Sequence, residues 1–116
     1  MINLKKLHHN AYRCNNSENT RKFYEDFLGL PLVDAFEIPT TMTGRSTKVL
    51  HTFYSLNDGS SLAFFEVANK TLKYKKWHDF DLHIALQVDE NILLKYYKLG
   101  KDNGIETRGI SDHGFI

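Results

Sequence analysis

The feature that most constrains the fold of this chain is a strand–helix pattern that occurs twice. One copy begins LHHNAYRC and the other DLHIALQV, and both fit the pattern His-x-Ala-(Tyr/Leu)-(Arg/Gln)-(Cys/Val). His9 stands 20 residues before Gly29, and His83 stands 21 residues before Gly104. Two units of nearly equal length that begin on the same residue type indicate an internal duplication.

The first unit predicts a strand followed by a helix. Residues 4–14 alternate apolar and polar positions, as a half-buried strand does. The run Asn15-Asn16-Ser17 offers side chains that cap a helix, and Gly29 suits the left-handed conformation that ends one. This helix is expected to bury Phe23, Tyr24, Phe27 and Leu28.

Three more strands are expected after this helix. They cover Leu32–Ile38, Lys48–Leu56 and Ser60–Val67. The turn Asn57-Asp58-Gly59 lies between the last two and is typical of a hairpin. The first unit therefore reads as strand, helix, strand, strand, strand.

The second unit follows a lysine-rich linker at residues 70–80 and predicts a strand over 81–88. A helix is expected from about Asp89 to Gly104, and a segment 105–116 completes the chain. The apolar positions of this strand are expected to point into a core under the helix. They are Leu82, Ile84, Leu86 and Val88.

The alternation of side chains sorts the candidate site residues by face. If alternate positions of the second-unit strand are buried, His83 and Gln87 lie on its other face. The repeat gives His9 and Arg13 the same position in the first unit. Glu66 lies at the end of the strand SSLAFFEV, on the face that we expect to be less apolar.

Two histidines and a glutamate on strands predict a site for a divalent transition metal with open coordination positions. The predicted ligands are His9, Glu66 and His83, and Fe, Mn, Ni or Zn would suit them. His51 is a candidate general base, and Arg13 and Gln87 are candidate substrate contacts. A structural reading stays open for each, because single strand histidines commonly make structural hydrogen bonds and Arg13 could form a surface salt bridge.

The composition excludes several other classes of protein. A net charge of +1 gives no strong attraction to nucleic acid or to a membrane surface. Cys14 is the only cysteine, so the chain cannot form an internal disulfide, and we expect its thiol to be buried. No apolar stretch has the length of a membrane span or a signal peptide, so a cytoplasmic location is expected.

These residues resemble the vicinal oxygen chelate superfamily, which includes glyoxalase I, bleomycin-resistance proteins and extradiol dioxygenases. The resemblance rests on the paired units, the lead histidines His9 and His83, and Glu66 after the FFE strand. The segments RKFYEDFLGLPLV, LNDGSSLAFFEV, LHIALQVDE and ISDHGFI are most similar to the small single-domain, dioxygenase-like branch. The similarity covers nearly the whole chain and is specific for the superfamily rather than for one reaction.

The resemblance implies an α+β fold in which two βαβββ modules form a curved mixed sheet around a cavity. Module one would cover residues 1–69 and a partial module two residues 81–116, within a single domain 1–116. The family's last ligand, a glutamate in the final strand, would lie beyond Ile116, so the second module is expected to be incomplete. A homodimer is also implied.

Three functions follow as alternatives. The first is a metal-dependent lyase, isomerase or extradiol dioxygenase acting on a small molecule with adjacent oxygen atoms. The second is a metal-free binding protein of the bleomycin-resistance type, in which aromatic residues such as Phe64 and Trp77 contact the ligand. The third is a remnant without function.

Overall fold

The computed structural model describes residues 2–40, 46–68, 73 and 82–111. The chain divides into two compact units, Met1–Lys75 and Lys76–Ile116, and the division falls within residues 70–80. No helix among the described residues is long and apolar enough to cross a membrane.

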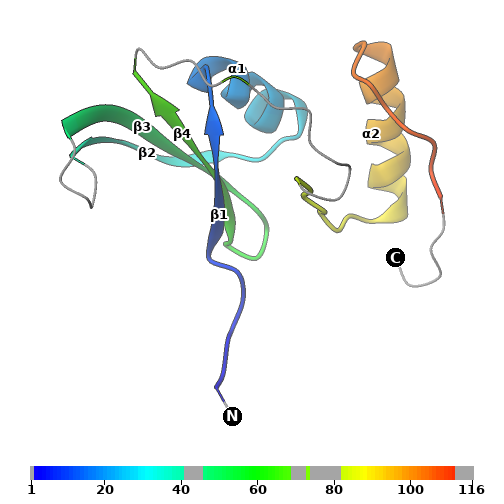
Figure 1. Cartoon of the computed structure of the whole chain (residues 1–116). Coiled ribbons are helices and arrows are strands. Elements are labelled where there is room, and N and C mark those ends of the chain that lie inside the picture. Colours follow the sequence, from blue (N-terminus) through cyan, green and yellow to red (C-terminus); the bar gives the residue numbers. More distant parts are fainter. Residues whose placement is uncertain (1, 41–45, 69–72, 74–81, 112–116) are drawn as a thin grey trace. The chain divides into compact units, whose positions relative to one another are not determined.

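The first unit contains a mixed sheet of four strands (Figure 1). Its strands are β1 (His9–Cys14), β2 (Leu32–Thr40), β3 (Ser46–Ser55) and β4 (Ser61–Val67). They lie in the order β1-β4-β3-β2, with β1 parallel to β4 and the other pairs antiparallel. With the helix between β1 and β2, this is the expected βαβββ order and an α+β fold.

One helical segment follows β1. The helix α1 (Ser17–Arg21) continues directly into a π-helical segment η1 (Lys22–Phe27). The Asn16 side chain accepts a hydrogen bond from the Asn19 amide at 2.9 Å, which caps a helix start that the sequence predicted. The segment ends before Gly29, whose φ of 76° is in the left-handed region, also as predicted.

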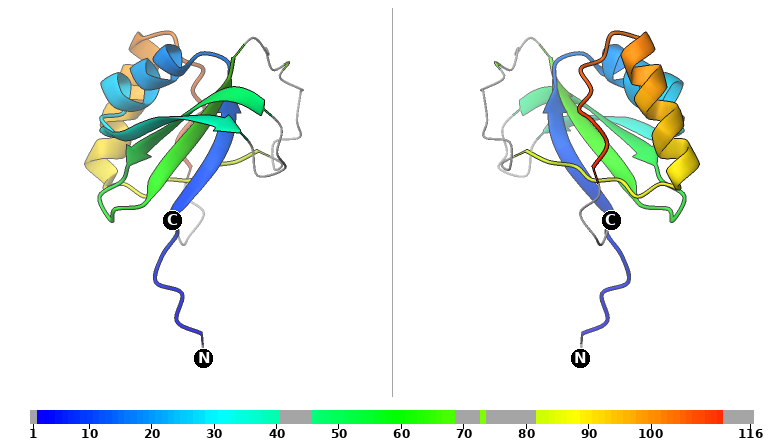
Figure 2. Two further views of the ribbon diagram at one scale, coloured as in Figure 1. Left: turned by 90° about the vertical axis from the view of Figure 1, so that its left-hand side faces the viewer. Right: turned by 90° about the vertical axis from the view of Figure 1, so that its right-hand side faces the viewer.

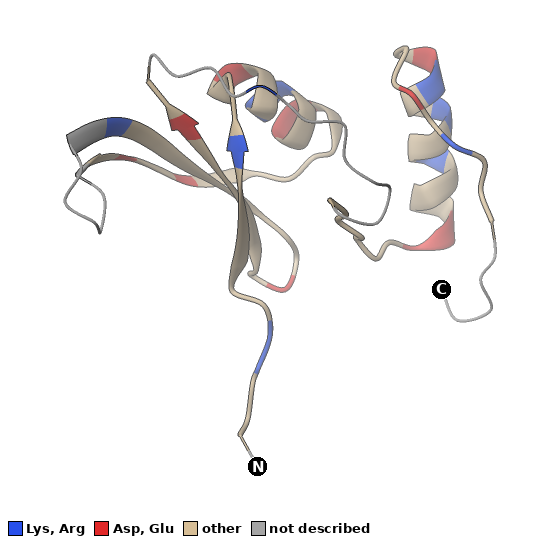
Figure 3. Ribbon diagram, in the orientation of Figure 1, with Lys and Arg blue, Asp and Glu red and all other residues tan. Residues whose placement is uncertain are grey.

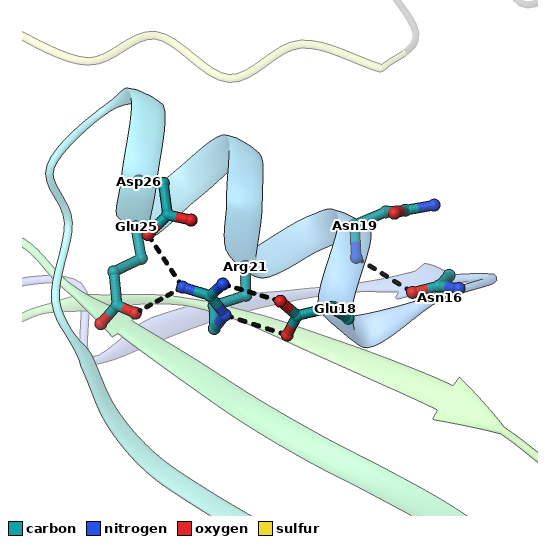
Figure 4. A network of polar contacts seen from close by, with 6 residues as sticks. All are labelled: Asn16, Glu18, Asn19, Arg21, Glu25 and Asp26. Carbon is teal, nitrogen blue, oxygen red and sulfur yellow. Dashed lines mark hydrogen bonds and ion pairs between the residues drawn. The ribbon is translucent and has the colours of Figure 1, made fainter.

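A group of ion pairs links α1 to η1 (Figure 4). The Arg21 guanidinium lies 2.7 Å from Glu18, 3.1 Å from Glu25 and 2.8 Å from Asp26. The hydrogen bond from Arg21 is the main cause that holds the pKa of Glu18 below its usual value. The second carboxylate oxygen of Glu25 accepts the Leu32 amide at 2.8 Å, so the network also anchors the start of β2.

The helical segment covers one face of the sheet (Figure 2). The core lies beneath it and contains Cys14, Tyr54, Leu62 and Phe64, packed against Tyr12, Tyr24, Leu30 and Leu32. Burial of Cys14 is confirmed. Burial also raises the pKa of Tyr54 above its usual value. Phe23, expected to be buried, is exposed, and its ring contacts those of Tyr24 and Phe27.

The hairpin between β3 and β4 turns where the sequence predicted. Gly59 has a φ of 82°, and the Leu56 amide donates to the Ser60 carbonyl at 2.8 Å. The expected strand over residues 4–14 is shorter in the structure, because β1 begins at His9. Leu4 and Leu7 are exposed before it, so their alternation does not reflect a paired strand.

The second unit contains the helix α2 (Glu90–Asp102). Its end is as expected, with Gly104 at a φ of 71°. The Ile105 amide then donates to the Gly100 carbonyl at 2.8 Å. A Cβ added at Gly100 would meet the Thr107 methyl group at 2.9 Å, so the chain after α2 packs closely against the helix.

The strand expected over 81–88 is not found in the described residues 82–88, which have no strand pairing. Its four apolar side chains are exposed rather than buried, with Leu82 at 57% and Val88 at 49%. A strand needs a neighbour to pair its backbone groups, and alternation of side chains does not supply one. The sequence pattern therefore did not determine this element.

Candidate functional site

The register of the strands shows which side chains share the face that α1 and η1 leave open. His9 is aligned with Ser61, Ala11 with Ala63, and Arg13 with Phe65. The pairing of β3 with β4 then adds His51 and Phe53, and the pairing of β2 with β3 adds Phe36. Aligned residues on paired strands point to the same side. We name the set His9, Phe36, His51, Phe53 and Phe65 the open-face cluster.

The rings of the open-face cluster contact one another. His51 stacks on Phe65 with ring centroids 3.8 Å apart, and its centroid lies 4.3 Å from that of Phe53. His9 lies 5.4 Å from Phe53 and 6.3 Å from His51. Both histidines come from strands that pair with β4, and their rings converge on the same part of the open face.

His51 is held in one tautomer. Its Nδ1 lies 3.0 Å from the Phe64 carbonyl oxygen, which can only accept, so Nδ1 carries the proton. In the neutral ring Nε2 is then the unprotonated nitrogen, which can accept a proton or bind a metal. His51 is only 6% exposed, and the surrounding aromatic rings fix its orientation.

Arg13 is on the same face, in the row of residues that contains Phe65 and His51. It is four residues from His9 along β1, or about 13 Å at the usual rise of a strand. Lysines, arginines and acidic residues occur on both strands and helices of the described chain (Figure 3). An exposed guanidinium at this position could pair with a substrate carboxylate at one end of the open face.

The structure does not bring Glu66 together with His9. Glu66 is aligned with Cys14 and therefore points to the helix-covered face. It is also five residues beyond Ser61, the register partner of His9, which corresponds to about 16 Å along the strand. Its carboxylate accepts a hydrogen bond from the Ser17 amide at the start of α1. This contact gives Glu66 a structural role, since a negative charge stabilises a helix N-terminus.

Phe64 is also on the helix-covered face. It is 6% exposed and its ring contacts Tyr12, Tyr24 and Tyr54 in the core. The structure therefore places Phe64 in the core, away from His9 and His51, and its contact with a substrate stays a prediction. Its neighbour Phe65 is on the open face instead, with Phe36 and Phe53, and the sequence analysis did not identify these three. Both faces of β4 are apolar, so alternation alone could not choose between them.

The remaining predicted residues belong to the second unit or to the linker. His83 and Gln87 are exposed in the segment 82–88. Trp77 lies outside the described residues. The structure thus describes His83 and Gln87 without testing their predicted roles.

His8 is a further histidine beside this face. It lies just before β1, and its Nδ1 is 2.8 Å from the Nδ1 of His9. The His8 carbonyl accepts the Ser61 amide at 3.0 Å, so its backbone is held next to β4.

The donor atoms fit a metal ion only in part. Imidazole nitrogens at His9 and His51 suit first-row divalent ions. Within the described residues, no group of three or more histidine, cysteine, aspartate or glutamate side chains is arranged to hold a metal ion. The Glu66 carboxylate, which the sequence predicted as a ligand, accepts a hydrogen bond from the Ser17 amide at the start of α1 instead. Histidine is therefore the donor type that the open face offers.

Comparisons with known proteins agree with this architecture. The sequence model of the Glyoxalase/Bleomycin resistance protein/Dioxygenase superfamily matches residues 6–115. No curated protein matches the chain significantly. A solved structure that is similar is a mutant of the genomically encoded fosfomycin resistance protein FosX from Listeria monocytogenes, complexed with Mn(II) and 1S,2S-dihydroxypropylphosphonic acid. The TM-score is 0.63 at 16% identity, covering 96% of this chain and 79% of that chain.

Proposed function

The chain belongs to the Glyoxalase/Bleomycin resistance protein/Dioxygenase superfamily, and we propose that it is a metal-dependent enzyme. Its substrate would be a small molecule with adjacent oxygen atoms, bound on the open face of the sheet. The observation that carries this proposal is that His9 and His51 share that face, with ring centroids 6.3 Å apart. The helical segment covers the opposite face, so this one is the face on which a ligand would bind.

His9 is the proposed metal ligand in the first unit, and His83 stays a predicted ligand from the sequence repeat. Fe, Mn, Ni and Zn all suit imidazole donors. Mn(II) is the first ion to test because the similar FosX structure contains it. When bound, such an ion polarises a substrate oxygen and stabilises negative charge on it. A homodimer also stays a prediction.

His51 and Arg13 have separate proposed roles in this enzyme. Neutral His51 would accept a substrate proton at Nε2, since its Nδ1 is committed to the Phe64 carbonyl. Arg13 would bind a carboxylate of the substrate. The rings of Phe53 and Phe65 would exclude water from His51, against which both pack.

Metal content tests the proposal. Tag-free protein is dialysed against Mn, Fe, Ni and Zn, and bound metal per chain is measured by inductively coupled plasma mass spectrometry. Wild type should retain metal, and His9→Ala and His83→Ala should each lose most of it. Full metal retention by His9→Ala would show that His9 is not a ligand.

Glu66→Gln is the matched control. Glu66 was a predicted ligand, but its side chain is on the other face and binds the Ser17 amide. The variant should keep the metal content of wild type and lose thermal stability. Loss of metal without loss of stability would return Glu66 to the ligand set.

A metal-free binding protein is the second candidate, and the open-face cluster favours it. Three phenylalanines surround the histidines, and Phe36 is 43% exposed. Aromatic rings bind ligands without a metal through burial and ring contacts. A thermal-shift screen of small molecules with and without chelator separates the two functions, because a bound ligand raises the unfolding temperature. Stabilisation that persists in chelator would support the binding protein.

A further inference from the structure

We infer that two copies of this chain pair through their β1 strands, so that Arg13 of the partner subunit lies beside His9. The two outer strands of the sheet are β1 and β2. Within the part of the chain that the structure describes, no strand pairs with the outer edge of either one. The pairing is independent of the proposed function, and only the shared site that it creates rests on that function.

The outer edge of β1 carries a row of unpaired backbone groups. The His8 carbonyl accepts the Ser61 amide at 3.0 Å, so the backbone groups of His8 point toward β4. Because these groups alternate in direction along a strand, those of His9, Ala11 and Arg13 point away from β4. All three residues are exposed. Such a row is a template for the addition of another strand.

The outer edge of β2 is built differently. Its register with β3 shifts twice, and exposed Pro39 lies in the second shift. Asp34 and Glu37 are exposed on the same strand. Proline, charged side chains and bulges are the features that keep an edge strand from pairing. In contrast, β1 pairs six consecutive residues with β4 without a shift, and Arg13 is its one arginine, lysine or acid before Cys14. The edge that can accept a strand is therefore that of β1.

A second copy of β1 fits this edge by symmetry. A twofold axis makes one edge complementary to itself when the two strands run antiparallel. With the axis at Ala11, all three outward-facing residues are used, and His9 is opposite Arg13 of the partner subunit. An axis at Arg13 would set two guanidinium groups against each other, which is destabilising. The charge pattern of the strand therefore favours the axis at Ala11.

This pairing changes what surrounds His9. Within one chain, Arg13 is about 13 Å from His9 along β1. Across the antiparallel pair, opposite residues that exchange hydrogen bonds have Cα atoms about 5.5 Å apart, and their side chains share a face. Arg13 of the partner subunit would therefore lie beside His9 on the open face. A substrate carboxylate bound near His9 would then be held by a guanidinium from the second copy.

Sedimentation of the tag-free, full-length chain tests the pairing. Ala11→Pro removes an amide that points outward and leaves the hydrogen bonds between β1 and β4, which alternate residues make. Ala11→Ser is the matched control because it keeps that amide. Wild type and Ala11→Ser should form dimers of equal affinity, and Ala11→Pro should weaken dimerisation at least about tenfold. Circular dichroism checks that both variants are folded.

Cysteine cross-linking tests the axis without relying on the proline variant. His9→Cys and Arg13→Cys chains are mixed under mild oxidation. They should form a disulfide-linked heterodimer, because a Cα separation of about 5.5 Å suits a disulfide. His9→Cys mixed with Val33→Cys is the control, since Val33 is an exposed residue of β2 and should give no heterodimer. Cys14 is buried and does not compete.

The outcomes separate this inference from the proposed function. A monomeric wild type, a dimer that Ala11→Pro leaves intact, or a dimer without the cross-link between positions 9 and 13 would each overturn the β1 pairing. Protection of the Ala11 amide from hydrogen exchange in a monomer would show that the same chain covers this edge. No measurement here uses a metal, so failure of the metal-content test would overturn the proposed function and leave the pairing in place.

Discussion

The two faces of the β1–β4 sheet are built from the same alternating strands but differ in what they hold. The helix-covered face contains Cys14, Leu62 and Phe64, which are buried with Tyr54. The open face contains two histidines among phenylalanine rings. On β4 the adjacent residues Phe64 and Phe65 belong to different faces. An aromatic residue in this sheet therefore contributes to the core or to the candidate site according to the face on which its side chain lies.

Replacing each of these two phenylalanines should give the largest difference between the faces. Phe64→Ala is expected to cost about 3–5 kcal/mol of unfolding free energy, because it leaves a cavity in a packed core. Phe65→Ala should cost clearly less, since Phe65 is only half-buried. Urea unfolding followed by far-ultraviolet circular dichroism measures both. Equal costs would mean that the two faces are packed alike.

Removing the carboxylate of Glu66 tests whether this residue stabilises the fold or serves as a metal ligand. Glu66→Ala should cost about 1.5–3 kcal/mol, the usual range for a hydrogen bond to a charged group, because the Ser17 amide loses its acceptor. The measurement is again urea unfolding, beside His8→Ala as a variant on exposed chain. A stability equal to wild type would argue that Glu66 does not support α1.

The smallest effect is expected from the ion pair between Glu18 and Arg21 in α1, the helix that covers one face of the sheet. The pKa of Glu18 is lowered in the folded protein, so the ionised side chain stabilises the fold at neutral pH. This stabilisation is lost as the pH falls below the ordinary pKa of 4.5 and through the lower pKa of the folded state. The unfolding temperature of Glu18→Gln should therefore be below that of wild type at pH 7 and converge with it in acid. In an Arg21→Gln background the Glu18 substitution should have little effect at either pH. A difference that persists in that background would assign the effect to another partner.

Much of the first unit could be predicted from local sequence signals. The helix cap within Asn15-Asn16-Ser17, the left-handed Gly29 and the turn at Asn57-Asp58-Gly59 are confirmed there, as is the end of α2 near Gly104 in the second unit. Each depends on a few neighbouring residues and on backbone preferences that act over one turn. The superfamily and the α+β class were also predicted correctly.

The site was predicted less completely, because a site depends on residues distant in the sequence. His51 is on the same face as His9, as its candidate role required. Glu66 and Phe64 were assigned to the wrong face, since both sides of β4 are apolar. The strand expected over 81–88 is not formed in the described residues 82–88 for a related reason. Alternation of side chains indicates a strand only where a neighbouring strand pairs with it.

The sequence by itself determined where the chain turns, where its helices begin and end, and that its histidines occur at repeated positions. Those properties follow from side-chain and backbone chemistry over a few residues. Only the tertiary structure decided which face the helix covers, because that choice depends on β1 pairing with β4 across about 50 residues of chain. The same pairing separated His9 from Glu66, and together with the pairing of β3 and β4 it placed His9 on one face with His51.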